Sequence, residues 1–220
     1  VNLHASLLPK YRGAAPINWA MIHGEQATGV SVISLAQKMD AGLIYATAQT
    51  PIDPLETAGE LHDRLAALGP AVVSDVLRAF ADGSLRGVPQ DERRATRAPK
   101  LSKADGHVDF TQDAQTVRSR IHGLTPWPGV RVRWVRRETP DKPLELSLLR
   151  VSAEPDLSCF IGFKGSGGAP RPGEIIDGPR VVVGDGAVRL LEVQLPGKRP
   201  MTIDQFMRGH PIAAGDRFES

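Results

Sequence analysis

The sequence is poor in the residues that build disulfides and thiolate metal sites, since Cys159 is its only cysteine among 220 residues. One cysteine excludes an intramolecular disulfide and a thiolate cage, and we interpret Cys159 as a small packing residue. The motifs HExxH and CxxC are also absent. Five histidines also lack the spacing that metal ligands have in the sequence; they are His23, His62, His107, His122 and His210. We therefore expect no metal site.

Long apolar runs are missing as well. No stretch approaches the ~18 apolar residues of a membrane span, and no charged-apolar-small leader begins the chain. A Gly-rich phosphate loop of the dinucleotide type is not found either. With 41% hydrophobic residues, the chain can bury the core of one or two domains. We expect a cytoplasmic protein with no membrane partner.

Charge is distributed unevenly around a formal net charge of +2. Residues 1–97 hold 9 Lys and Arg against 10 Asp and Glu, whereas residues 98–220 hold 18 against 15. The basic excess suits a polyanionic partner, but a solvated arginine-rich face explains it equally well. The densest group of arginines comprises Arg118, Arg120, Arg131, Arg133, Arg136 and Arg137.

The opening segment VNLHASLLP combines an amide and an imidazole two residues apart. If residues 1–5 form a strand, Asn2 and His4 project to the same side, because side chains alternate across a strand. Pro9 ends the strand, since it has no amide hydrogen and holds Leu8 extended. The apolar residues predict an interior strand of a parallel sheet, whose carboxyl end is the usual place for a site.

The rest of the first half alternates helical and extended patterns. We predict a helix over 16–24, opened by its proline, and strands over 29–35 and 39–48, with Asp40 in the bend between them. Thr57 and Glu60 have the spacing of a capping box. Two helical pieces then follow to Gly83, interrupted at Gly69-Pro70.

Residues 84–104 are rich in Arg, Pro and Lys and lack apolar periodicity, which predicts a linker. A helix is expected over 111–123, followed by short strands and Gly-rich turns that indicate a small barrel. Trp127 lies between two prolines and is interpreted as a packing residue, with base stacking as the alternative. The predicted strands are 130–135, 144–151, 173–176, 181–183 and 188–195, and the turns are 165–168 and 184–186.

Several separated motifs occur in one order along nearly the whole chain. They are NLHASLLP (2–9), RGAAPI (12–17), MDAG (39–42), the segment 61–70, KLSK (100–103) and PWPG (126–129). In this order they resemble the folate-dependent formyltransferases, and within them the methionyl-tRNA formyltransferases. The resemblance implies an α/β fold, with a partial Rossmann-like formyltransferase domain over 1–97, a linker over 98–104 and an OB-fold domain over 105–220.

Members of that family carry roughly a further hundred residues before the position of Asn2. The resemblance therefore implies that the chain is the carboxyl-terminal two thirds of an enzyme. A fragment, a mis-called reading frame and one part of a split protein with a separate amino-terminal half are the open alternatives. We expect the chain as given to be inactive alone.

The activity implied by the resemblance is formyl transfer from 10-formyltetrahydrofolate to the amino group of methionyl-tRNA in translation initiation. Such a reaction needs a donor for the developing oxyanion and a group that moves a proton. By resemblance, Asn2, His4 and Asp40 form the catalytic trio. The alternatives are a sugar-amine formyltransferase, a formyltetrahydrofolate hydrolase and an inactive RNA-binding fragment.

Further residues are expected to bind the two substrates. No covalent intermediate is required, so Ser6 is a poor nucleophile candidate and is better suited to local hydrogen bonding. For Arg12, a surface salt bridge is the alternative to an RNA contact. We assign Ser6, Leu7, Leu8 and Pro9 to the folate, and Arg12, Lys100, Lys103, Arg131 and Arg133 to the tRNA.

Overall fold

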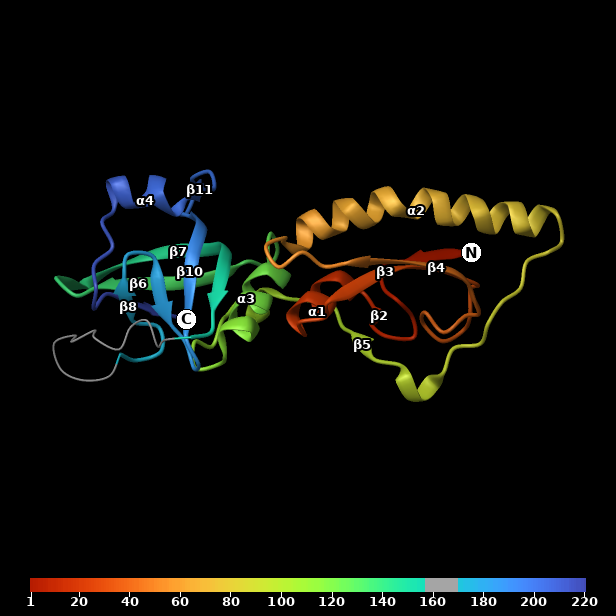
Figure 1. Ribbon diagram of the computed structural model, residues 1–220, viewed down its shortest axis with the longest axis horizontal. Helices are drawn as coiled ribbons and strands as arrows, with labels where there is room; N and C mark the ends of the chain where they lie inside the picture. Colours follow the sequence, from red (N-terminus) through yellow and green to blue (C-terminus); the bar gives the residue numbers. More distant parts are fainter. Residues whose placement is uncertain (157–169) are drawn as a thin grey trace. The chain divides into compact units, whose positions relative to one another are not determined.

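The computed structural model describes residues 1–156 and 170–220. The chain divides into two compact units, Val1–Leu101 and Ser102–Ser220, which are drawn in Figure 1. Cys159 and the turn predicted at 165–168 lie outside the described residues. No helix in the described part of the chain is long and apolar enough to cross a membrane.

The first unit contains a three-stranded sheet in the order β1-β3-β4. β1 (Asn2–His4), β3 (Ala27–Ile33) and β4 (Ile44–Pro51) pair antiparallel throughout. The prediction of a parallel sheet is therefore wrong for the pairing of β1 that the structure describes. The prediction of an interior strand is also wrong for this sheet, since β1 is its edge strand and Leu3 is 42% exposed. Apolar content carries no information about the direction of a neighbouring strand.

One long helix, α2 (Ala58–Ala81), packs on β3 and β4 (Figure 1). Its capping box at Thr57 and Glu60 is confirmed. The predicted break at Pro70 is wrong, because the helix runs through it. Both halves bury one apolar stripe in the same core, which offsets the hydrogen bond that the proline removes. The stripe consists of Leu61, Leu65, Val72 and Val76.

Two smaller pieces complete the first unit. Helix α1 (Pro16–Ile22) begins at its proline, as predicted, and buries Ile17, Ala20 and Met21. β2 (Arg12–Gly13) pairs parallel with β5 (Arg97–Ala98), and the 3-10 helix η1 (Glu92–Arg94) precedes β5. Ala98 is fully buried. Much of the segment predicted as a linker over 84–104 is thus packed into the first unit.

The second unit is a nearly closed antiparallel barrel-like sheet in the order β12-β6-β7-β10-β9-β8, with β11 paired to β10. An antiparallel bridge between Glu174 and Arg217 joins the two ends of this order. The strands are β6 (Val130–Arg136), β7 (Thr139–Glu154), β8 (Ile175–Asp177), β9 (Arg180–Val182), β10 (Ala187–Gln194), β11 (Met201–Thr202) and β12 (Arg217–Glu219).

Most of the helices and strands of the second unit were predicted from the sequence patterns. Strands occur in all five predicted regions, and helix α3 (Ala114–Gly123) occupies the predicted helical region. η2 (Lys103–Asp105), α4 (Ile203–Gly209), β11 and β12 were not predicted. Trp127 is 49% exposed, so it is not part of the buried core of the second unit, and packing and base stacking both stay predictions for this side chain.

Asp216 holds the closing end of the barrel through three hydrogen bonds. Its carboxylate accepts from Trp134 Nε1 at 3.1 Å, from the Arg137 amide at 2.8 Å and from the Ala213 amide at 3.2 Å. Both Asp216 and Trp134 are buried, and the Trp134 ring meets Phe206 edge-on at 5.5 Å. A buried donor without an acceptor is costly, so these bonds stabilise the closure.

We expect Asp216→Ala to lower the free energy of unfolding by about 3 kcal/mol, because it leaves buried donors unsatisfied. Urea denaturation followed by tryptophan fluorescence measures the change. Asp177→Ala is the matched control, since that carboxylate is 69% exposed and its partner is Arg180. The control should change stability by no more than about 0.5 kcal/mol. Equal losses in the two variants would contradict the role of Asp216.

Candidate active site

Strand β1 places Asn2 and His4 on one side of the sheet. Leu3, between them, points the other way and packs against α2, where a Cβ on Gly69 would come within 2.5 Å of Leu3 Cδ2. His4 lies opposite Ser31 of β3 in the register, and its side chain is only 7% exposed. The alternation predicted from the sequence therefore puts an amide and a buried imidazole on the same face.

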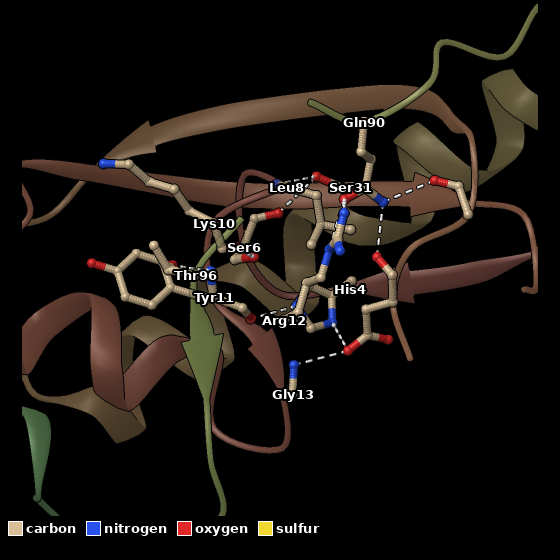
Figure 2. Close-up of polar contacts among 12 residues, drawn as sticks. His4, Ser6, Leu8, Lys10, Tyr11, Arg12, Gly13, Ser31, Gln90 and Thr96 are labelled. Carbon is tan, nitrogen blue, oxygen red and sulfur yellow. Dashed lines mark hydrogen bonds and ion pairs between the residues drawn. The ribbon is translucent and has the colours of Figure 1, made fainter. Parts of the chain in front are cut away.

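The two ring nitrogens of His4 have different partners, as Figure 2 shows. Nε2 lies 2.9 Å from the backbone oxygen of Tyr11, and Nδ1 lies 3.7 Å from Oδ2 of Asp40. A carbonyl oxygen can only accept, so Nε2 must carry a proton. In neutral His4 the free lone pair is then on Nδ1. The nitrogen that can take up or release a proton is the one that faces Asp40.

Tyr11, which accepts from His4, is fixed by its own contacts. Its amide donates to Thr96 Oγ1 at 2.8 Å, and its hydroxyl donates to Glu25 at 2.8 Å. Burial, reinforced by the hydrogen bond to Glu25, raises the pKa of the Tyr11 hydroxyl. The Tyr11 backbone is left-handed, with φ of 63°. These contacts hold the carbonyl that sets the tautomer of His4.

Asp40 lies in the turn that precedes β4, as predicted, with a left-handed φ of 53°. Its side chain is 15% exposed, and Oδ2 accepts from the Gly13 amide at 2.9 Å. The same oxygen faces His4 Nδ1. Gly13 has a φ of 131°, and a Cβ there would come within 2.4 Å of the Ala98 oxygen, so only glycine fits.

The segment assigned to the folate follows β1. Ser6 is fully buried, and its hydroxyl donates to the Lys10 oxygen at 2.7 Å. Ser31 ties the segment to β3, since its hydroxyl donates to the Ser6 oxygen and accepts from the Leu8 amide. The Ser6 hydroxyl thus serves the loop. Leu7 and Pro9 are half-buried, Leu8 is buried, and a folate contact by these residues stays a prediction.

Arg12 is buried, and its guanidinium is bound by other residues of the protein. Its side chain is 7% exposed, and its guanidinium donates to Gln90 at 3.0 and 2.7 Å and to Glu92 at 2.7 Å. Lys38 also bonds Glu92. Hydrogen bonds from Arg12 and Lys38 lower the pKa of Glu92 to about 2. Glu92 therefore stays charged until the pH falls well below 4.5, its ordinary pKa.

The other residues assigned to RNA are on the surface of their own units. Lys100, Lys103, Arg131 and Arg133 are all exposed. Arg133 lies 3.5 Å from a carboxylate oxygen of Glu219. Arg131 borders a cavity of about 240 Å³. The cavity is also lined by Glu145, Leu146, Ser147, Gln194, Leu195, Pro196 and Gly197.

Sequence reasoning missed Gln90, Glu92 and Thr96, which connect to the site residues through side-chain bonds. They lie in the segment taken as a linker. The polar run QDE between Pro89 and two arginines was the available signal, but composition alone cannot tell a solvated loop from one that supports a site. Within residues 1–156 and 170–220, no group of three or more His, Cys, Asp or Glu could hold a metal ion.

Comparison of the chain with known proteins identifies its family. The formyl transferase model matches residues 1–77, and the model of the formyl transferase C-terminal domain matches residues 100–211. The chain belongs to the formyl transferase family. It is 38% identical to a methionyl-tRNA formyltransferase of Sorangium cellulosum over 98% of its own length, and it spans 66% of that relative.

Solved structures of two other proteins have a similar fold. HypX from Aquifex aeolicus, in complex with tetrahydrofolic acid, matches 93% of this chain with a TM-score of 0.63 and 21% identity, over 34% of the HypX chain. WlaRD, a sugar 3N-formyl transferase, matches 90% of this chain with a TM-score of 0.62 and 16% identity, over 65% of that protein. At these identities the likeness shows the fold of the formyl transferases, and it does not identify the acceptor.

Proposed function

We propose that the protein transfers the formyl group of 10-formyltetrahydrofolate to the α-amino group of methionyl-tRNA. The observation that carries the proposal is the polarised His4, with Nε2 bound to a carbonyl and Nδ1 facing Asp40, on the same face as Asn2. The whole-chain identity to a methionyl-tRNA formyltransferase supports this acceptor. The folate complex of the structural neighbour supports the donor.

In the proposed reaction, the neutral amine attacks the formyl carbon, and the bond from that carbon to the folate nitrogen breaks. The side-chain amide of Asn2 donates to the oxyanion that forms in between. His4 Nδ1 accepts the proton that the amine loses and returns it to the departing folate nitrogen. The Asp40 carboxylate stabilises the imidazolium that exists between these two transfers. No group on the enzyme is acylated.

The two units take different parts in this proposal. We infer that residues 1–97 are the catalytic part of a Rossmann-like formyltransferase domain, that 98–104 connect the units, and that 105–220 form an OB-fold domain that contacts the tRNA. The nearly closed antiparallel sheet and the exposed arginines of the second unit support the last assignment. Translation initiation would place the protein in the cytoplasm.

A direct assay tests the function. The protein that contains this chain is incubated with 10-formyltetrahydrofolate and methionyl-tRNA, and N-formylmethionyl-tRNA is measured by acid gel or mass spectrometry. Parallel reactions replace the tRNA by a nucleotide-linked amino sugar or omit every acceptor. Formylated tRNA is the expected product. Formyl transfer to the sugar alone, or release of formate without an acceptor, would overturn the proposed acceptor.

Salt dependence tests the assignment of RNA contacts to Arg131 and Arg133. Each arginine that neutralises a phosphate contributes roughly 0.7 to 0.9 to the slope of log affinity against log salt. Arg131→Gln and Arg133→Gln should therefore each reduce that slope by about this amount in tRNA titrations. Arg86→Gln, an exposed arginine of the first unit, is the matched control. Unchanged slopes in both barrel variants would remove these residues from the RNA interface.

A further inference from the structure

Gln90 connects two parts of the site that are far apart in the sequence. Its Nε2 donates to the backbone oxygens of Asp40 and Gly42, each at 2.8 Å. Its Oε1 accepts from Nε and Nη2 of Arg12 at 3.0 and 2.7 Å. Figure 2 shows Gln90 above Arg12, with bonds on both sides of its amide. One side chain thus links the turn that carries Asp40 to the segment that follows His4.

The orientation of this amide is fixed by chemistry. A guanidinium can only donate, and two carbonyl oxygens can only accept. If the amide were reversed, its NH₂ would face donors and its oxygen would face two acceptors. In the observed orientation, both N–H groups and both lone pairs of Gln90 are used. The contact with Arg12 therefore directs both donors of Gln90 at the turn of residues 40–42.

The backbone on either side of Gln90 places it there. Val88 and Ile44 exchange hydrogen bonds of 2.8 and 2.9 Å, which attaches the segment before Gln90 to the start of β4. After Gln90, β5 pairs with β2, which begins at Arg12. The segment 88–98 therefore runs from the Asp40 turn to the strand that follows His4. Its position makes it a support for the site.

The Asp40 turn needs such a support. A left-handed backbone is uncommon for a residue with a side chain, and surrounding contacts must hold it. Gln90 holds the Asp40 carbonyl, and Gly13 holds its carboxylate. At Gly42 a Cβ would come within 1.9 Å of the Ser34 oxygen, so the turn also packs closely. The distance from the Asp40 carboxylate to His4 Nδ1 depends on this backbone.

We propose that Gln90 is a positioning residue, oriented by Arg12, that sets the place of the Asp40 carboxylate relative to His4. The inference rests on the proposed function for its kinetic consequences. Gln90 acts through Asp40 and needs no contact with either substrate. Its contribution should therefore appear in turnover, and it should disappear when the Asp40 carboxylate is absent.

Gln90→Glu tests the proposal with an isosteric change. The carboxylate keeps the contact with Arg12 but turns an oxygen, in place of the NH₂ group, towards the two carbonyls. We expect kcat for formyl transfer to fall roughly 10- to 100-fold, because a misplaced catalytic group is costly. Gln90→Asn, a neutral and smaller variant that cannot span the gap, should also lower kcat. Gln49→Glu, the same change at an exposed position of β4, should not.

Combination with Asp40→Ala separates positioning from general damage. In that background, Gln90→Glu should lower kcat by no more than about twofold, since the group it positions is gone. The imidazole ¹⁵N signals of His4 should move in Gln90→Glu and remain at wild-type positions in Gln49→Glu. Wild-type kcat in both Gln90 variants, or an equal loss with and without Asp40, overturns the proposal. If the unmodified protein transfers no formyl group, the proposed function fails, and the His4 signals alone decide the positioning role.

Discussion

Replacing His4 by glutamine should lower kcat/KM for formyl transfer at least ~100-fold while the protein stays folded. The reason is the unequal use of the two ring nitrogens. The glutamine amide can donate to the Tyr11 oxygen in place of Nε2, but it offers no group that exchanges protons at neutral pH. Steady-state kinetics with methionyl-tRNA measure the loss, and thermal unfolding reports the fold.

His62→Gln is the matched control, because His62 is exposed on α2 and the substitution is the same. Its kcat/KM should equal that of the unmodified protein. Asp40→Ala should lose at least ~100-fold as well, since the imidazolium then has no carboxylate beside it. Binding of the tRNA should survive in both site variants. Turnover by His4→Gln at the unmodified rate would remove His4 from the chemistry.

The parts of the site that could be predicted were those with a local signal. Alternation along β1 puts Asn2 and His4 on one face, and the bend between two β-rich segments contains Asp40. Each of these two predictions depends only on residues that are adjacent in the sequence. The contact between His4 and Asp40 was expected from the family resemblance, because no local pattern joins positions 36 residues apart.

The support for the site could not be predicted in this way. Arg12 and Gln90 are 78 residues apart, and their contact follows from how β2, β5 and the Val88 bridge assemble. Residue type alone does not show whether an arginine is buried or solvated. Arg12 was assigned to RNA with a salt bridge as the alternative, and in the structure its guanidinium is bound to Gln90 and Glu92, while the RNA contact stays a prediction.

In the fold, the presence of the long helices and strands was predictable, but their continuity and the direction of strand pairing were not. The capping box of α2 was predicted from Thr57 and Glu60, but the prediction broke the helix at Gly69-Pro70, because a proline removes a backbone hydrogen bond and no local pattern shows that the helix continues through it. Strand direction also had no local signal. The apolar residues of β1 fit a parallel or an antiparallel partner equally well, and its pairing with β3 is antiparallel.

Asn2→Asp should reduce turnover more than Asn2→Ala, and each should lose roughly 10²- to 10³-fold. The alanine variant removes the donor to the oxyanion. The aspartate variant has the same size, but it places a negative charge where negative charge develops, so it opposes the transition state directly. Single-turnover rates with saturating donor and acceptor measure the chemical step apart from binding.

The order of these two Asn2 variants is the decisive result, because a purely structural role predicts the opposite order. Asn2 is half-buried opposite Ile33, so a structural loss should be smaller for the isosteric aspartate than for alanine. Gln49→Glu adds the same charge at an exposed position of the same sheet and should turn over normally. An aspartate variant that keeps its rate within about threefold of the unmodified protein would exclude an oxyanion donor at this position.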